Sequence, residues 1–167
     1  MKGNGSNDGR KTGADQEGIL SLTARFLLST AATILIITGL IKVLSVFGSA
    51  GMLSVKDPVF GISFGVLMPL VGVTEVAVGL AVLFCRSGVV ASALILWMGL
   101  EFVAYRFFSA ELRPGGYCPC LGSLGEFLGL NQAQATHAAL LICLMLLLLG
   151  LLALAVNLFA KRHHVKG

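Results

Sequence analysis

The feature that most constrains this chain is an uninterrupted apolar run near its C-terminus. Residues 138–156 contain no charged side chain. As an α-helix, a run of this length rises roughly 28 Å, which matches a bilayer hydrocarbon core of about 30 Å. Because backbone N–H and C=O groups cannot stay unpaired in lipid, we expect this run to be a membrane-spanning helix.

Three further apolar runs precede it, and the composition agrees with a membrane protein. We predict spans at about 22–47, 59–85, 89–108 and 134–159. Hydrophobic residues make up 56% of the chain and charged residues 12%. Soluble domains typically have about 25% charged residues, and so few charges cannot cover a water-facing surface. The sequence therefore predicts an all-α bundle of four transmembrane helices in contact with membrane lipid. It excludes a soluble enzyme, a disordered chain and a nucleic-acid-binding module.

The two ends of the chain are polar. Residues 1–18 hold no apolar run, so we expect a disordered tail. Residues 161–167 form a short basic tail, which leaves 22–160 as the transmembrane domain. Arg25, the apolar run after it and the small residues 48–50 loosely fit a signal peptide. We favour a retained first helix, because the polar leader and the apolar run are both long.

The basic residues predict the orientation. With four spans, both termini lie on one face of the membrane, and that face holds most of the Lys and Arg residues. They are Lys2, Arg10, Lys11, Arg25, Arg86, Lys161, Arg162 and Lys166. The opposite face holds Lys42, Lys56, Arg106 and Arg113. Because basic residues are enriched on the cytoplasmic side, we predict both termini in the cytoplasm, in a bacterial inner membrane.

The most distinctive chemistry lies in the predicted outward loop between the last two spans. Cys118 and Cys120 stand on either side of Pro119, within a Pro- and Gly-rich segment at 114–122. Pro119 fixes its own φ and disfavours the helical conformation of the residue before it, which holds the two sulfurs close together. This pair is the candidate catalytic site.

Three functions fit the pair of thiols. A disulfide that spans one residue is strained and easily reduced, so the pair suits thiol–disulfide exchange in an oxidising compartment. Two thiolates also suit Cu(I), although no Met-rich outward segment accompanies them. In the third interpretation the chain is a non-catalytic scaffold or helper subunit, and a loop cysteine pairs elsewhere, for example with Cys143. We favour redox exchange and predict no metal site.

The segment after the cysteine pair carries two helix signals. Residues 121–130 have apolar side chains at helical spacing, which predicts a short interfacial helix before the last span. Asn131 and Gln134 have the spacing of a capping box and predict the start of that span. His137 opens the span on the side of the cysteines. It either assists thiolate formation or is a plain interfacial histidine.

Glu75 is the most informative ionisable residue within the spans. It shares one predicted helix face with a stripe of mostly small residues: Gly61, Gly65, Met68, Gly72 and Gly79. Small residues let helices approach closely, so Glu75 should face the bundle. Charged groups in lipid are costly, and their default interpretation is functional. The alternative is a structural role, in which Glu75 is protonated or pairs with Lys42.

Glu101 is a second intramembrane carboxylate. It lies at helical spacing from Trp97 and Tyr105, which offer hydrogen-bond donors to it. Such an aromatic surface could accept a quinone ring, although packing is its commoner use, and we predict no resident cofactor. Arg106 either assists the site or extends its charge to the interface. Together with Lys42 and Glu75, Glu101 would hold the bundle together or line a site for an electron carrier.

Three motifs, in this order, resemble the MauE/DoxX family of four-helix membrane proteins, and its MauE type more closely. Residues 39–42 look like the family's Gly-x-x-Lys, and residues 75–80 look like its Glu-x-x-x-Gly-Leu. Residues 118–122 look like the Cys-x-Cys-Phe-Gly that precedes the last span, with Leu121 in place of Phe. The resemblance covers roughly residues 25–159.

The resemblance implies a redox-associated role. MauE, a methylamine utilisation protein, is needed for maturation of the disulfide-rich periplasmic small subunit of methylamine dehydrogenase, and family members often work beside thioredoxin-like periplasmic proteins. The resemblance implies neither a role in methylamine metabolism nor an enzymatic activity for this chain. We expect thiol–disulfide exchange with a periplasmic thioredoxin-like or disulfide-containing protein, or maturation of a periplasmic redox protein, through Cys118 and Cys120.

Overall fold

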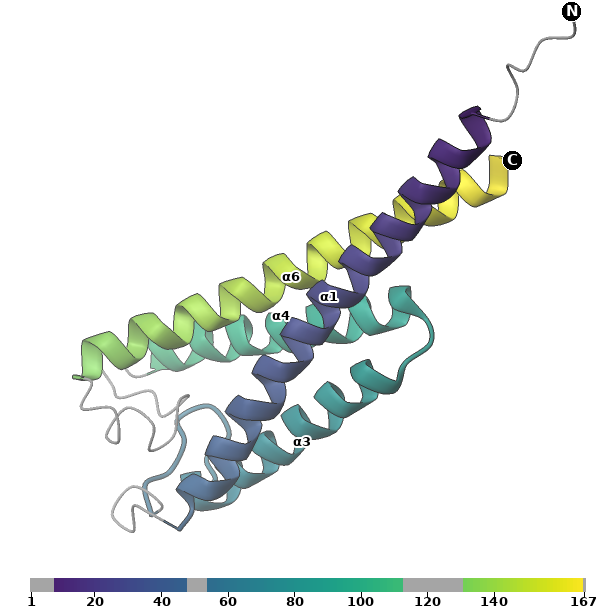
Figure 1. The fold of residues 1–167 in the computed structure, drawn as a ribbon. Coiled ribbons are helices and arrows are strands. Elements are labelled where there is room, and N and C mark those ends of the chain that lie inside the picture. The colour runs from purple at the N-terminus through teal and green to yellow at the C-terminus, as the bar shows by residue number, and fades with distance from the viewer. Residues whose placement is uncertain (1–7, 48–53, 113–130, 167) are drawn as a thin grey trace, which may run out of the picture.

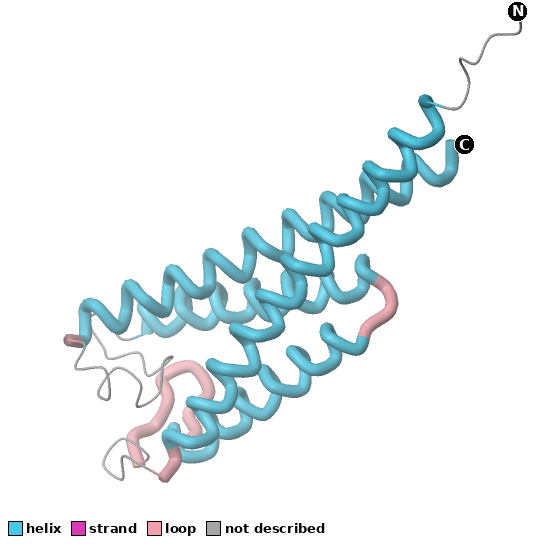
Figure 2. Tube along the Cα trace, in the orientation of Figure 1, coloured by secondary structure: helices cyan, strands magenta, loops and turns pink. Residues whose placement is uncertain are grey.

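Four long helices dominate the computed structural model of the chain (Figure 1). The structure describes residues 8–47, 54–112 and 131–166. The helices are α1 (Asp8–Ser45), α3 (Phe64–Phe84), α4 (Gly88–Leu112) and α6 (Gln132–Lys166). Each helix contains a stretch that is long and apolar enough to cross a membrane. The predicted all-α bundle of four membrane-spanning helices is confirmed, and short loops account for the other described residues (Figure 2).

The spanning stretches are Ile19–Ser45, Phe64–Phe84, Gly88–Leu112 and Thr136–Lys161. They differ most from the sequence prediction at the second span, which was expected to begin at residue 59. Residues 59–63 instead belong to a turn, in which Gly61 has a φ of 71°. Glycine adopts this left-handed conformation without a Cβ penalty. The turn is apolar in sequence, so hydropathy alone extends the helix through it.

The ends of the first and last helices extend beyond the apolar stretches. α1 begins at Asp8, inside the region 1–18 that the sequence predicts to be a disordered tail, and its apolar stretch begins directly after that region. The predicted interfacial helix at 121–130 lies outside the described residues. The predicted capping box at the start of α6 is confirmed. The N–H of Gln134 donates to Oδ1 of Asn131 at 2.9 Å, and the N–H of Asn131 donates to Oε1 of Gln134 at 3.0 Å.

The helices associate as two pairs. α1 packs chiefly against α3, α4 packs chiefly against α6, and α1 also lies along α6 (Figure 1). Glycines bring the backbones of α1 and α3 together, because a Cβ at Gly39 would lie 2.6 Å from the carbonyl oxygen of Gly72. The central core is formed mostly by small and aliphatic residues from all four helices: Leu28, Ala31, Ala32, Leu35, Val82, Ala91, Ile95, Met98, Leu146 and Ala153. Close packing of small residues is the main source of helix association in lipid.

The two ends of the bundle differ in what they carry. The start of α1, the end of α6 and the short α3–α4 connection lie at one end, which we call the termini end (Figure 1). The end of α1, the start of α3, the end of α4 and the start of α6 lie at the opposite end, which we call the loop end (Figure 1). The chain segment with the two loop cysteines is therefore joined to the bundle, on both sides, at the loop end.

Candidate functional site

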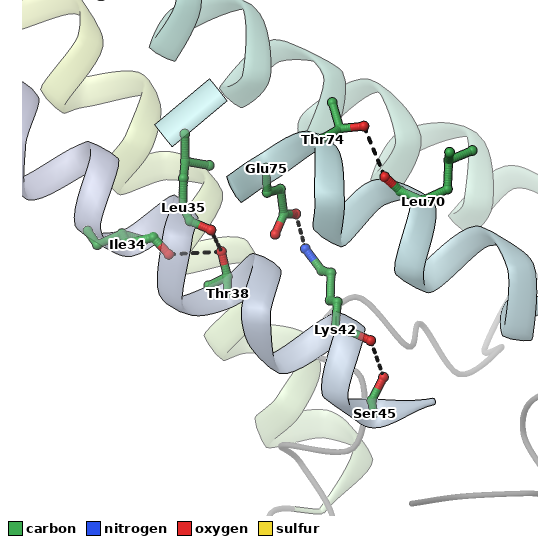
Figure 3. Close-up of polar contacts among 8 residues, drawn as sticks. All are labelled: Ile34, Leu35, Thr38, Lys42, Ser45, Leu70, Thr74 and Glu75. Atoms are coloured by element: carbon green, nitrogen blue, oxygen red, sulfur yellow. Dashed lines mark hydrogen bonds and ion pairs between the residues drawn. The ribbon is translucent and has the colours of Figure 1, made fainter. Parts of the chain in front are cut away.

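A buried ion pair between α1 and α3 forms the centre of the candidate site. Nζ of Lys42 donates to Oε1 of Glu75 (Figure 3). Lys42 is 7% exposed and Glu75 is 0% exposed. Nζ of Lys42 also lies 4.9 Å from the ring centroid of Phe102 on α4, within range of a cation–π interaction. Lys42 thus links three of the four helices.

The contact between two glycines explains how the lysine and the glutamate reach each other. Gly39 and Gly72 lie three residues before Lys42 and Glu75, respectively. A side chain at either glycine would collide with the facing backbone, so the two helices touch one turn away from the ion pair. Glu75 therefore faces the bundle, as its small-residue stripe predicts. Its partner is Lys42, as in the structural alternative drawn from the sequence.

A partly open cavity of about 40 Å³ lies beside the ion pair, toward the loop end. Three helices supply its walls. α1 contributes Thr38 and Lys42, α4 contributes Phe102, Tyr105 and Arg106, and α6 contributes Cys143 with two apolar neighbours. A single water needs roughly 10–15 Å³ of such space, so the cavity has room for a compact polar group.

Most polar groups in the cavity wall have partners within the protein. The hydroxyl of Thr38 donates to the carbonyl oxygens of Ile34 at 2.9 Å and Leu35 at 3.1 Å (Figure 3). The hydroxyl of Tyr105 donates to Oδ2 of Asp57 at 2.5 Å. Two buried side-chain atoms of the described residues have no hydrogen-bond partner: Oε2 of Glu75 and Nη1 of Arg106. The site therefore keeps one acceptor and one charged donor unused.

Asp57, in the loop between α1 and α3, anchors that loop to α4. Its side chain is buried, and its Oδ1 accepts hydrogen bonds from the N–H of Val59 at 2.9 Å and of Phe60 at 2.7 Å. The ring of Phe60 stacks on Tyr105 with centroids 6.1 Å apart. The aspartate holds the turn closed in the manner of an Asx turn, and the tyrosine holds the turn against the bundle.

The structure does not form the predicted cluster around Glu101. Glu101 is exposed on α4, and Trp97 is 49% exposed. Tyr105 donates to Asp57 instead of Glu101, because the loop brings a buried carboxylate over its hydroxyl. His137 is exposed in the second turn of α6.

Of the remaining predicted residues, two line the cavity and two lie in the segment 113–130, which is outside the described residues. Arg106 lines the cavity. Cys118 and Cys120 lie outside the described residues. Cys143, interpreted as a small buried hydrophobe or a disulfide partner, is a buried thiol in the cavity wall and is not bonded to Cys85. Within the part of the chain that the structure describes, no three His, Cys, Asp or Glu side chains converge on a metal site.

Sequence reasoning missed three residues of this site. Asp57 precedes a proline and a nearby glycine, a signal that indicates a turn but not a partner on another helix. Thr38 and Phe102 carry no sequence signal beyond their place on apolar helices. Their role follows from helix packing alone.

No family model matches the chain, and no curated protein or solved structure is significantly similar to it.

Proposed function

We propose that this membrane protein takes part in thiol–disulfide exchange at the outer face of a bacterial inner membrane, through Cys118 and Cys120. The partner would be a periplasmic thioredoxin-like or disulfide-containing protein, as the resemblance to MauE-type members of the MauE/DoxX family implies. One observation carries this proposal. Lys42 and Glu75, which belong to two of the three motifs behind the resemblance, meet in one buried ion pair.

The tethering of the cysteine segment supports the same proposal. The third motif lies between Leu112 at the end of α4 and Asn131 at the start of α6, and both ends lie at the loop end (Figure 1). The ion pair and the cavity lie toward that end as well. A rigid body beneath a cysteine-bearing loop would give a partner protein a fixed surface on which to present its disulfide.

The placement of two basic residues within helices supports the proposed orientation. Of the four basic residues on the loop side, Lys42 is buried in the ion pair and Arg106 lines the cavity. Neither lies in a loop, where basic residues bias topology most strongly. The loop side then keeps only Lys56 and Arg113 in its connecting segments. This asymmetry favours cytoplasmic termini and an outward loop end.

The exchange would run through a mixed disulfide. The thiolate of one loop cysteine attacks a sulfur of the partner disulfide, and the partner's other sulfur leaves as a thiolate. The second loop cysteine then attacks the mixed disulfide. The loop pair ends as a disulfide, and the partner ends as a dithiol that has gained two electrons and two protons. Run in reverse, the same steps oxidise the partner.

Single cysteine substitutions test this function. Cys118→Ser and Cys120→Ser should each be expressed in cells, and one of them should accumulate a mixed disulfide with a periplasmic protein. Non-reducing electrophoresis with mass spectrometry would detect it. Cys143→Ser is the matched control, because it removes a thiol buried among the helices and should trap nothing.

Two results would contradict the proposal. One is the absence of a trapped species in both loop variants together with normal maturation of periplasmic disulfide proteins. The other is a reporter tag inserted after Leu112 that maps to the cytosol, because thiol exchange of this kind needs the oxidising side of the membrane.

A further inference from the structure

The cavity between α1, α4 and α6 is lined by an arginine that has one buried nitrogen without a partner in the described structure. Nη1 of Arg106 is buried and has no hydrogen-bond partner. Leaving a buried charged donor unpaired is costly, and native proteins rarely do so without a reason. Arg106 lines a cavity that has room for a compact polar group.

The nearby carboxylates do not fill this role. Oδ1 of Asp57 accepts two backbone N–H groups, and Oδ2 accepts the hydroxyl of Tyr105. Glu75 is bonded to Lys42 and is not among the residues that line the cavity. Two basic side chains, Lys42 and Arg106, therefore line a cavity into which neither carboxylate extends.

We propose that this cavity binds a compact oxyanion, a carboxylate or phosphate group, held by Arg106 with support from the charge of Lys42. The planar guanidinium matches the paired oxygens of carboxylates and phosphates and can bind them with two parallel hydrogen bonds. Phe102 and the apolar residues of α6 give the cavity a wall of low polarity, in which an ion pair is stronger than in water. The proposal is independent of the loop cysteines.

Such a group has two natural sources, which are a small anion dissolved in water and the headgroup of an anionic lipid. Both present the same oxygens to Arg106. The first experiment uses the full chain purified in a zwitterionic detergent, with inorganic phosphate or sodium acetate titrated against sodium chloride at constant ionic strength. Thermal unfolding is followed by the fluorescence of the single tryptophan, Trp97. A saturable rise of about 3–6 °C is expected at ten times the dissociation constant.

The second experiment places the protein in lipid nanodiscs of phosphatidylcholine, with or without phosphatidylglycerol. A rise that requires phosphatidylglycerol identifies the lipid headgroup as the source. A rise with phosphate or acetate in pure phosphatidylcholine identifies a soluble anion. Either rise supports the proposal only if it depends on Arg106.

Three variants decide that dependence. Arg106→Gln should abolish the rise, whereas Arg25→Gln, which removes an exposed arginine far from the cavity, should leave it intact. If Arg106→Gln does not fold, Cys143→Leu serves instead, because a larger side chain fills the cavity without changing its charge. A rise that survives in the cavity variant, or no rise with phosphate, acetate or phosphatidylglycerol, overturns the proposal and leaves a cavity that holds water only.

Discussion

Two buried carboxylates lie toward the loop end of this bundle, and they differ in how completely they are bonded. Both oxygens of Asp57 are used, by two backbone N–H groups and one tyrosine hydroxyl. Only one oxygen of Glu75 is used, by Lys42, and the other has no partner. The first site is complete within the protein, whereas the second keeps unused bonding capacity beside a cavity.

This difference separates Asp57, which has a structural role, from the region around Glu75, which is a candidate binding site. Asp57 closes a turn and attaches it to α4, and every bond it makes is internal. Lys42 and Glu75 join α1 to α3, while Oε2 of Glu75 and Nη1 of Arg106, which lies on α4, are left without partners. Unsatisfied buried polar atoms in a native fold call for an explanation, and a ligand is one of the few that fits.

The sharpest test of the comparison is removal of one member of the ion pair. Glu75→Leu leaves Lys42 buried without its counter-charge, so the free energy of unfolding should fall by about 3–5 kcal/mol. Unfolding by sodium dodecyl sulfate in mixed micelles would measure it. The double variant Lys42→Met with Glu75→Leu removes both charges and should recover most of the loss. A single variant no less stable than the double would show that the pair is not needed to neutralise Lys42.

Replacing Asp57 should lower the free energy of unfolding by less than replacing Glu75 does. Asp57→Ala frees two backbone N–H groups and the hydroxyl of Tyr105, so the loss should be about 1.5–3 kcal/mol, in the range of hydrogen bonds to charged groups. Tyr105→Phe breaks only one of these bonds and should cost about 1 kcal/mol. The same unfolding assay compares them. Equal losses in the two variants would mean that the turn contributes nothing beyond the tyrosine contact.

The close approach of α1 and α3 is the condition on which the ion pair depends. Gly72→Ala places a Cβ 2.6 Å from the carbonyl oxygen of Gly39, so the helices must separate, with a loss of about 1–3 kcal/mol. Val73→Ala is the matched control, because Val73 is 58% exposed on the same helix. If both variants retain the same midpoint in the unfolding assay, the helices are not in contact at these glycines.

The smallest effect is expected for a polar contact between α4 and α6, away from the loop end. Nδ2 of Asn157 lies 3.4 Å from Oγ of Ser92 and also donates to the carbonyl oxygen of Ala153 at 2.8 Å. Because this amide keeps a good local partner, Ser92→Ala should cost only about 0.6 kcal/mol, which is typical of polar contacts between membrane helices. A loss as large as that of Asp57→Ala would place a second essential polar anchor in the bundle.

Sequence patterns correctly predicted which side of a helix a residue lies on, but they did not predict its partner on another segment. The stripe with Gly72 and Gly79 correctly predicted that Glu75 faces the bundle, because a period near 3.6 residues determines which side chains share a side. The same reasoning assigned Tyr105 to Glu101 on its own helix. In the structure the hydroxyl of Tyr105 donates instead to Asp57, 48 residues away, because a turn folds back over the end of α4.

The number of spans and their helical conformation were determined by the sequence alone. Lipid offers no partner for backbone polar groups, so an apolar run of sufficient length has essentially one conformation open to it. The interior position of Glu75 was also readable, from the small residues around it. The tertiary structure alone decided that Lys42 contacts Phe102, that Asp57 accepts the hydroxyl of Tyr105, and that Nη1 of Arg106 remains without a partner. These contacts depend on how the helices rotate and cross, which is set by close packing of all four and by no single segment.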